Sequence, residues 1–192
     1  MLLLTKAAIL AGLITFQNPV PGQFVPGPPL IPAPLTKLEA FAAKTGALLT
    51  TERYALSRIY GENSCSVRFQ VVIMYASGQE AQKLGGLRVE ITPAGAKEPT
   101  VSYMDLDELP ILSRAIDSML DLNQKGTAFT NPASRELSFS SAGGLRLAMV
   151  QRDSQREFVV NHVYNGSSCV VNRDTSVIEL KTAIDKVLQD LR

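Results

Sequence analysis

The sequence of 192 residues has no tryptophan and only one histidine, His162. Catalytic zinc centres usually need two or more imidazole ligands, so one chain with a single histidine is a poor candidate for that chemistry. No G-x-S-x-G motif is present to position a serine for nucleophilic attack. We therefore expect a protein that is not an enzyme and that binds no metal and no cofactor.

The chain also lacks an excess of charge of either sign. Its 19 Lys and Arg residues balance 18 Asp and Glu residues, which gives a formal net charge of +1. Nucleic-acid-binding domains are usually strongly basic, so this balance argues against nucleic acid as a partner. The hydrophobic content of 45% is that of an ordinary globular protein.

Acidic residues are absent from the first 38 positions. Within residues 1–16 the single charge is Lys6, which precedes ten uncharged residues from Ala7 to Phe16. This length is typical of a signal peptide and is short of the ~20 apolar residues that cross a membrane. We interpret residues 1–22 as a signal peptide cleaved before Gln23. We expect an exported protein, periplasmic or extracellular, without a transmembrane span in its mature chain. A buried N-terminal helix and an uncleaved anchor are the alternatives.

Proline is concentrated in one place: seven of the eleven prolines lie between Pro19 and Pro34. Proline has no backbone N–H and favours extended conformations, which predicts a semi-rigid spacer over residues 23–34. The alternative is a ligand for a proline-recognising groove. Residues 35–192 then form a single α+β domain, beginning with a helix over 35–46 that ends at Gly46.

The first half of this domain alternates apolar and polar residues as strands do. Val67, Phe69, Val71, Ile73 and Tyr75 occupy every second position, which predicts that all five face the core. With strands near residues 48–59, 87–91 and 101–103, this half has four strands. An amphipathic helix follows, and Asp105 with Glu108 forms a capping box at its start.

The second half has the same order of four short strands and a helix. Asn165-Gly166 predicts a two-residue type I′ turn between its last two strands, and Ser176 with Glu179 predicts a capping box. The apolar residues of the two predicted helices have the same spacing, displaced by 68 residues. They are Leu109, Leu112, Ile116, Met119 and Leu120 in the first helix, and Val177, Leu180, Ile184, Val187 and Leu188 in the second.

These patterns predict an α+β fold, an antiparallel sheet with two amphipathic helices, in which 47–122 and 127–192 are candidate repeats of a ββββα unit. The alternative is an ordinary α+β domain without duplication. The phrase GGLR occurs at 85–88 and at 143–146, a displacement of 58 rather than 68 residues. We therefore expect its two copies to occupy different strands of the two units.

A ββββα unit repeated over residues 47–192 resembles the single-stranded nucleic-acid-binding group that includes the PC4 coactivator and the plant Whirly proteins. That resemblance implies nucleic acid binding, but SVRFQVVIMY, the second strand here, lacks the KGKAAL motif of the Whirly proteins. The segment VSYMDLDELPILSRAID, with a Gly-Gly strand after it, is similar to uncharacterised exported bacterial domains. This second similarity implies no activity.

The two cysteines, Cys65 and Cys169, are a candidate disulfide between the two halves if the chain is exported. The alternative is two small buried hydrophobic side chains. Three further residues are candidate ligand contacts. Arg88 and Arg146 follow the two Gly-Gly pairs on the polar sides of their strands, where an anion would reach them, although strand arginines are more often simply solvated. His162 shares its side of a strand with Phe158, Val160 and Tyr164, a context in which a lone histidine is usually packed or hydrogen-bonded.

These observations favour an exported, non-enzymatic binding or structural module whose partner is a cell-envelope protein or a small ligand. The alternative is a single-stranded nucleic-acid-binding protein with PC4-like or Whirly-like architecture.

Overall fold

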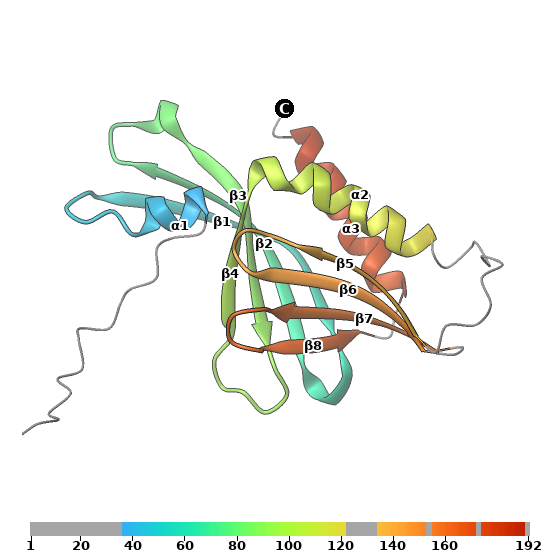
Figure 1. The fold of residues 1–192 in the computed structure, drawn as a ribbon. Coiled ribbons are helices and arrows are strands. Elements are labelled where there is room, and N and C mark those ends of the chain that lie inside the picture. The colour runs from blue at the N-terminus through green and yellow to red at the C-terminus, as the bar shows by residue number, and fades with distance from the viewer. Residues whose placement is uncertain (1–35, 122–133, 153–154, 172–173, 191–192) are drawn as a thin grey trace, which may run out of the picture. The chain divides into compact units, whose positions relative to one another are not determined.

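Two four-stranded antiparallel sheets, each followed by a helix, make up the computed structural model (Figure 1). It describes residues 36–121, 134–152, 155–171 and 174–190, all within one compact unit, Ala33–Arg192. The predicted signal peptide and spacer, residues 1–22 and 23–34, lie outside the described residues. Among the helices described, none combines the length and the apolar character needed to cross a membrane.

The first sheet has the order β1-β2-β3-β4 and the second the order β5-β6-β7-β8, so every strand pairs with its neighbour in the chain. The strands are β1 (Leu49–Tyr60), β2 (Ser66–Ala76), β3 (Leu84–Thr92), β4 (Thr100–Asp105), β5 (Ser134–Ser140), β6 (Leu145–Arg152), β7 (Gln155–His162) and β8 (Ser168–Val171). The helices are α1 (Lys37–Ala42), α2 (Leu109–Asp121) and α3 (Asp174–Asp190), and three 3₁₀ turns are η1 (Glu62–Ser64), η2 (Glu80–Gln82) and η3 (Leu106–Glu108). The α+β prediction is confirmed, with two sheets in place of one.

Both sheets and both long helices contribute to one hydrophobic core. The strands of the second sheet cross in front of those of the first, and α2 and α3 run side by side (Figure 1). Four of the five apolar positions predicted for each helix are buried, Leu109, Leu112, Ile116 and Met119 on α2 and Val177, Leu180, Ile184 and Val187 on α3. The fifth of each set, Leu120 and Leu188, is only partly buried against the same core. Each sheet presents alternate residues to this core, because side chains alternate between the two faces of a strand.

The prediction for β2 is wrong in its second half. Val67, Phe69 and Val71 face the main core, but Ile73 and Tyr75 are only partly buried, while Val72 and Met74 on the opposite face are buried. The reason is α1, which packs on that opposite face and forms a second, smaller cluster there. Because one strand serves two cores, no single alternation describes it.

Helix α1 is also shorter than predicted and ends before Gly46. It is held by contacts from its own first turn and from the end of β4. Thr36 and Glu39 form a capping box at its start. In addition, the Asp105 carboxylate at the end of β4 accepts hydrogen bonds from the backbone N–H groups of Lys37, at 2.8 Å, and Leu38, at 3.1 Å. Leu38 is fully buried, so these contacts hold α1 against the first sheet.

Two predicted local signals differ in the structure. Gly166 has a positive φ of 73° but Asn165 does not, so the connection between β7 and β8 is not a type I′ turn. It is a longer loop closed by the His162 N–H, which donates to Ser167 O at 2.8 Å. Ser176 lies inside α3, which already begins at Asp174, and therefore does not cap it. By contrast, Glu108 accepts the Asp105 N–H at 3.1 Å at the start of η3, as predicted.

The two GGLR copies occupy different strands, as expected. The first lies in β3, the third strand of its unit, and the second lies at the start of β6, the second strand of its unit. Gly143 and Gly144 form the turn before β6, where Gly144 has a φ of 80°. The phrase therefore has no common structural role in the two units.

Cys65 and Cys169 lie at disulfide distance, with their Sγ atoms 2.01 Å apart and their Cα atoms 5.5 Å apart. Cys65 lies between η1 and β2 in the first unit, and Cys169 is in β8 of the second. Both are buried, at 3% and 1% exposure. The bridge thus joins the two ββββα units at the edge of their shared core.

Candidate functional site

A cavity of about 320 Å³ lies between the end of α2 and the second sheet. Seven residues line it: Met119 from α2, Arg135, Glu136 and Leu137 from β5, Met149 and Gln151 from β6, and Arg156 from β7. Its size falls in the range of small-molecule sites. It is therefore the candidate functional site in the described part of the chain.

The register of the strands builds the site as two rows across the sheet. Leu137 pairs with Met149, which pairs with Phe158, and this apolar row continues the hydrophobic core. Two residues farther along the strands, Arg135 pairs with Gln151, and Gln151 pairs with Arg156. Residues two apart on a strand share a face, so the polar row lies directly beyond the apolar one.

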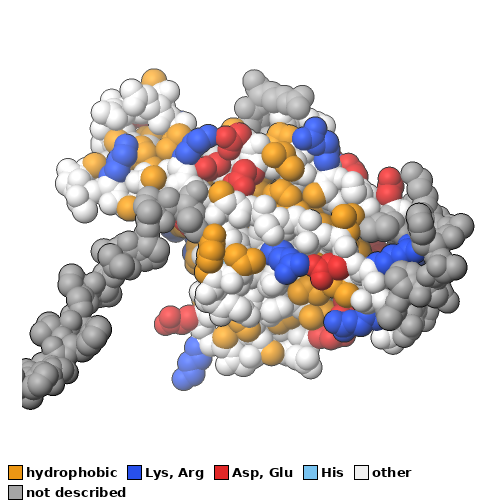
Figure 2. Space-filling model, in the orientation of Figure 1, with side chains coloured by type: hydrophobic (Ala, Val, Ile, Leu, Met, Phe, Trp, Pro, Cys, Tyr) orange, Lys and Arg blue, Asp and Glu red, His pale blue; other side chains and the backbone are white. Residues whose placement is uncertain are grey.

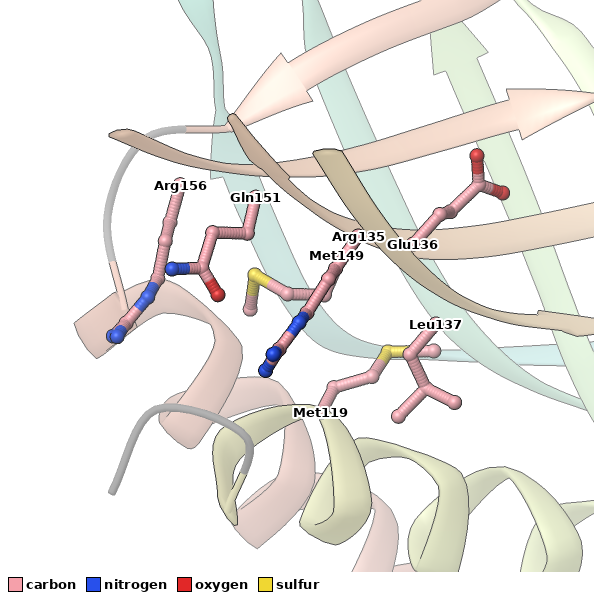
Figure 3. A pocket seen from close by; sticks show the side chains of 7 residues that line it. All are labelled: Met119, Arg135, Glu136, Leu137, Met149, Gln151 and Arg156. Atoms are coloured by element: carbon pink, nitrogen blue, oxygen red, sulfur yellow. The ribbon is translucent and has the colours of Figure 1, made fainter. Parts of the chain in front are cut away.

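Figure 3 shows how these side chains are oriented. Leu137 and Met149 approach Met119 in the space below the sheet, and Arg135 extends into that space beside them. Gln151 and Arg156 lie next to each other on the neighbouring strands. Glu136 points the other way, toward the outer face, where its carboxylate forms an ion pair with Arg146. The one carboxylate among the seven lining residues, that of Glu136, is thus held away from the polar row.

The polar row concentrates positive charge on one side of the cavity. Arg135 and Arg156 are separated by one strand, which places their backbones roughly 10 Å apart at the usual strand spacing. Both side chains are half-buried, and each guanidinium carries five N–H donors and no acceptor. The row is therefore suited to an anion or to a group rich in acceptor oxygens.

The lining offers binding groups but little that would catalyse a reaction. Among the described residues, this lining has no histidine, cysteine, serine, lysine or tyrosine, and its one carboxylate is paired with Arg146. In the described ranges, no three His, Cys, Asp or Glu side chains come together to hold a metal ion. Arginine and glutamine donors beside methionine and leucine are groups that commonly line ligand-binding sites.

The predicted ligand residues Arg88 and Arg146 are not brought together. Arg88 lies on the polar face of β3, where it donates to the Gln70 Oε1 atom at 2.8 Å and forms an ion pair with Glu90. Burial lowers the pKa of Arg88, but its hydrogen bonds to Glu90 and Tyr103 outweigh burial and leave that pKa above its ordinary value. Arg146 lies on the outer face of the second sheet and pairs with Glu136. Each arginine has its own carboxylate partner, and neither lines the cavity.

His162 ends the core-facing row of β7, where it pairs across strands with Leu145. Its ring meets that of Tyr164 edge-on, with centroids 5.5 Å apart, and its buried Nδ1 atom has no hydrogen-bond partner. No carboxylate or hydroxyl contact to this ring is among the described hydrogen bonds. The histidine is thus positioned by packing, at the loop between β7 and β8.

A second hollow of about 320 Å³ lies between α1, the start of β3 and η3. Lys37 and Asp107 form an ion pair of 2.6 Å across it, which raises the pKa of Lys37 and lowers the pKa of Asp107. Asp105, which also lines it, caps α1. Its charged groups therefore serve the attachment of α1, and we regard it as structural.

Sequence reasoning missed the residues of the cavity, although a signal for them existed. Arg135 precedes Leu137 by two positions, and Arg156 precedes Phe158 by two positions. Each arginine therefore begins the core-facing side of its strand, where a charged residue is unusual. Only the pairing of β5, β6 and β7 shows that they share one row.

No protein-family model, curated protein or solved structure matches this chain. The arguments below therefore come from its own geometry.

Proposed function

We propose that this protein is an exported, non-enzymatic module that binds a small ligand in the cavity between α2 and the second sheet. The observation that carries the proposal is the two-row lining, an apolar row backed by the core and a polar row of two arginines and a glutamine. Ligand sites commonly combine an apolar wall with a few polar groups that fix orientation. The described residues of this lining include no nucleophile, and its one carboxylate is paired with Arg146, which favours binding without turnover.

Export is supported by two independent features. Residues 1–22 have the pattern of a signal peptide. The two cysteines lie at disulfide distance, and disulfides persist mainly in oxidising compartments. Intact-mass measurement of the protein from periplasmic and culture fractions tests export: we expect a chain shortened by roughly the first 22 residues. A full-length chain in the cytosolic fraction would contradict it.

Binding is tested by recording ¹H–¹⁵N spectra of the protein with a library of small fragments. We expect hits that shift the amides of Leu137, Met149 and Gln151. Leu137→Trp, which fills the cavity, should abolish these shifts, whereas Val163→Trp, at an exposed position on the β7–β8 loop, should leave them unchanged. Circular dichroism checks that both variants fold. A library without a single hit at these amides would rule out the proposal.

The alternative, a single-stranded nucleic-acid-binding protein, is favoured by one observation, the double ββββα order. Against it, Arg88 and Arg146 on the polar faces of the two sheets are paired with carboxylates. Acidic and basic side chains are interspersed on the face shown in Figure 2. Such surfaces neutralise few phosphates, and phosphate neutralisation provides most of the affinity for nucleic acid. Titrating a labelled oligonucleotide at low salt separates the two functions, because only the alternative predicts salt-dependent binding.

A further inference from the structure

We infer that the ligand of the cavity is a medium-chain carboxylate, held by its head group at Arg135 and Arg156 and by its aliphatic tail against Met119, Leu137 and Met149. This inference rests on the proposed binding function and specifies its ligand class. It follows from the order of the two rows, their charge and the size of the space between them.

The order of the rows requires a ligand with two different ends. The apolar row of Leu137 and Met149 and the polar row of Arg135, Gln151 and Arg156 are two residues apart along the strands, which is roughly 7 Å. A uniformly polar ligand would leave the methionine and leucine surface in contact with a polar group. A uniformly apolar one would take two charged guanidinium groups out of water without offering them a polar contact of its own. A head and a tail separated by a few bonds satisfy both rows.

The charge of the polar row selects a negative head group. Two guanidinium groups flank one neutral amide. The carboxylates that adjoin the arginines in sequence are Glu136, which is turned to the outer face and paired with Arg146, and Glu157, which is paired with Arg152. Arg135, Gln151 and Arg156 already take part in other interactions, but a guanidinium has five donors and serves more than one acceptor. Its planar fork matches the two oxygens of a carboxylate, and Gln151 adds an amide donor between the arginines.

The size of the cavity limits the tail. A volume of about 320 Å³ lies at the lower end of the range of small-molecule sites, which suits a single short chain. Octanoate is such a chain, whereas a two-chain lipid does not fit. Met119 and Met149 form much of the apolar wall, and the flexible methionine side chain adapts to unbranched chains of slightly different length.

The test compares four compounds by isothermal titration calorimetry on the full mature protein: octanoate, octanol, octylamine and acetate. We expect octanoate to bind at least tenfold more tightly than octanol, because only octanoate meets the arginines. Octylamine should not bind, because its charge is repelled, and acetate should not bind, because it has no tail. Equal affinity for octanoate and octanol would overturn the carboxylate assignment.

Variants separate the two ends of the ligand. Arg135→Gln and Arg156→Gln should each weaken octanoate binding about tenfold and leave octanol binding unchanged. Arg53→Gln removes an exposed arginine on β1 that is not among the lining residues, and should change neither. Unchanged octanoate affinity in both cavity variants would overturn the inference.

The fragment spectra distinguish the two levels of failure. If fragments shift the cavity amides but octanoate does not, the ligand class is wrong and the binding function stands. If neither octanoate nor any fragment shifts these amides, both proposals fail together.

Discussion

Gly61, the residue between β1 and η1, shows how closely the structure is packed around the disulfide. A Cβ atom at this position would lie 2.6 Å from the Sγ atoms of both Cys65 and Cys169 and would also collide with the carbonyl oxygen of Val170. Gly61 has a negative φ of −106°, so its requirement is for space and not for a left-handed backbone. We expect Gly61→Ala to lower the free energy of unfolding by about 1–3 kcal/mol, the usual cost of overpacking.

Gly85→Ala is the matched control for this prediction. Gly85, near the start of β3, also lacks a positive φ, but its nearest neighbour for an added Cβ is Leu106 Cδ2 at an ordinary 4.0 Å. Urea titration of the two variants and the parent measures the difference. Similar midpoints for the two variants would show that the region around the disulfide relaxes easily.

At the scale of single residues, the sequence predicts burial where one element faces one core. The helix positions Leu112 and Ile116, and Val67 and Phe69 in β2, are buried as their spacing predicts. Prediction fails at Ile73 and Tyr75 because α1 covers the other face of β2, a contact between segments about 30 residues apart. The sequence does not predict the cavity residues for a similar reason, because only the register of the strands aligns Arg135 with Arg156.

At the scale of elements, α1 illustrates a helix that depends on its surroundings. It has six residues, and isolated helices shorter than about 12 residues are marginal in water. Its stability therefore comes from the capping box, from burial of Leu38 and Phe41, and from the Asp105 carboxylate that accepts two of its N–H groups. The sequence does not predict this last contact, because its pattern assigns Asp105 only to the capping box of the helix that follows β4.

We expect Asp105→Ala to destabilise α1 by about 1–2 kcal/mol, the usual cost of losing a helix cap. The backbone donors of Lys37 and Leu38 would lose their acceptor, and Leu38 is in a buried setting. Amide hydrogen exchange should accelerate in residues 38–43, and also at the start of η3, whose capping box loses the Asp105 side chain. Asp107→Ala is the control, because it removes a neighbouring carboxylate whose ion pair with Lys37 is solvent-exposed and should contribute little. Equal exchange in both variants would show that the Asp105 contact is dispensable.

At the scale of the whole molecule, the double ββββα order does not produce two independent domains. One core cluster contains residues from both sheets and both long helices, including Phe69 and Leu112 from the first unit and Phe158 and Leu180 from the second. Neither unit would bury its apolar face alone, because that face is covered by the other unit. We therefore expect both units to unfold together in a single transition, as small domains with one core usually do.

The disulfide acts on this same transition. Cys65 and Cys169 are separated by 104 residues, so their bond restricts the unfolded chain over most of the described sequence. The chain-entropy model assigns about 4–5 kcal/mol to a loop of this length. Cys65→Ala with Cys169→Ala should thus lower the thermal midpoint in non-reducing buffer, yet circular dichroism and tyrosine fluorescence should still report one coincident transition, because the shared core remains. Two separate transitions would show that the bridge, and not the core, couples the units, whereas an unchanged midpoint would show that the bridge contributes nothing to stability.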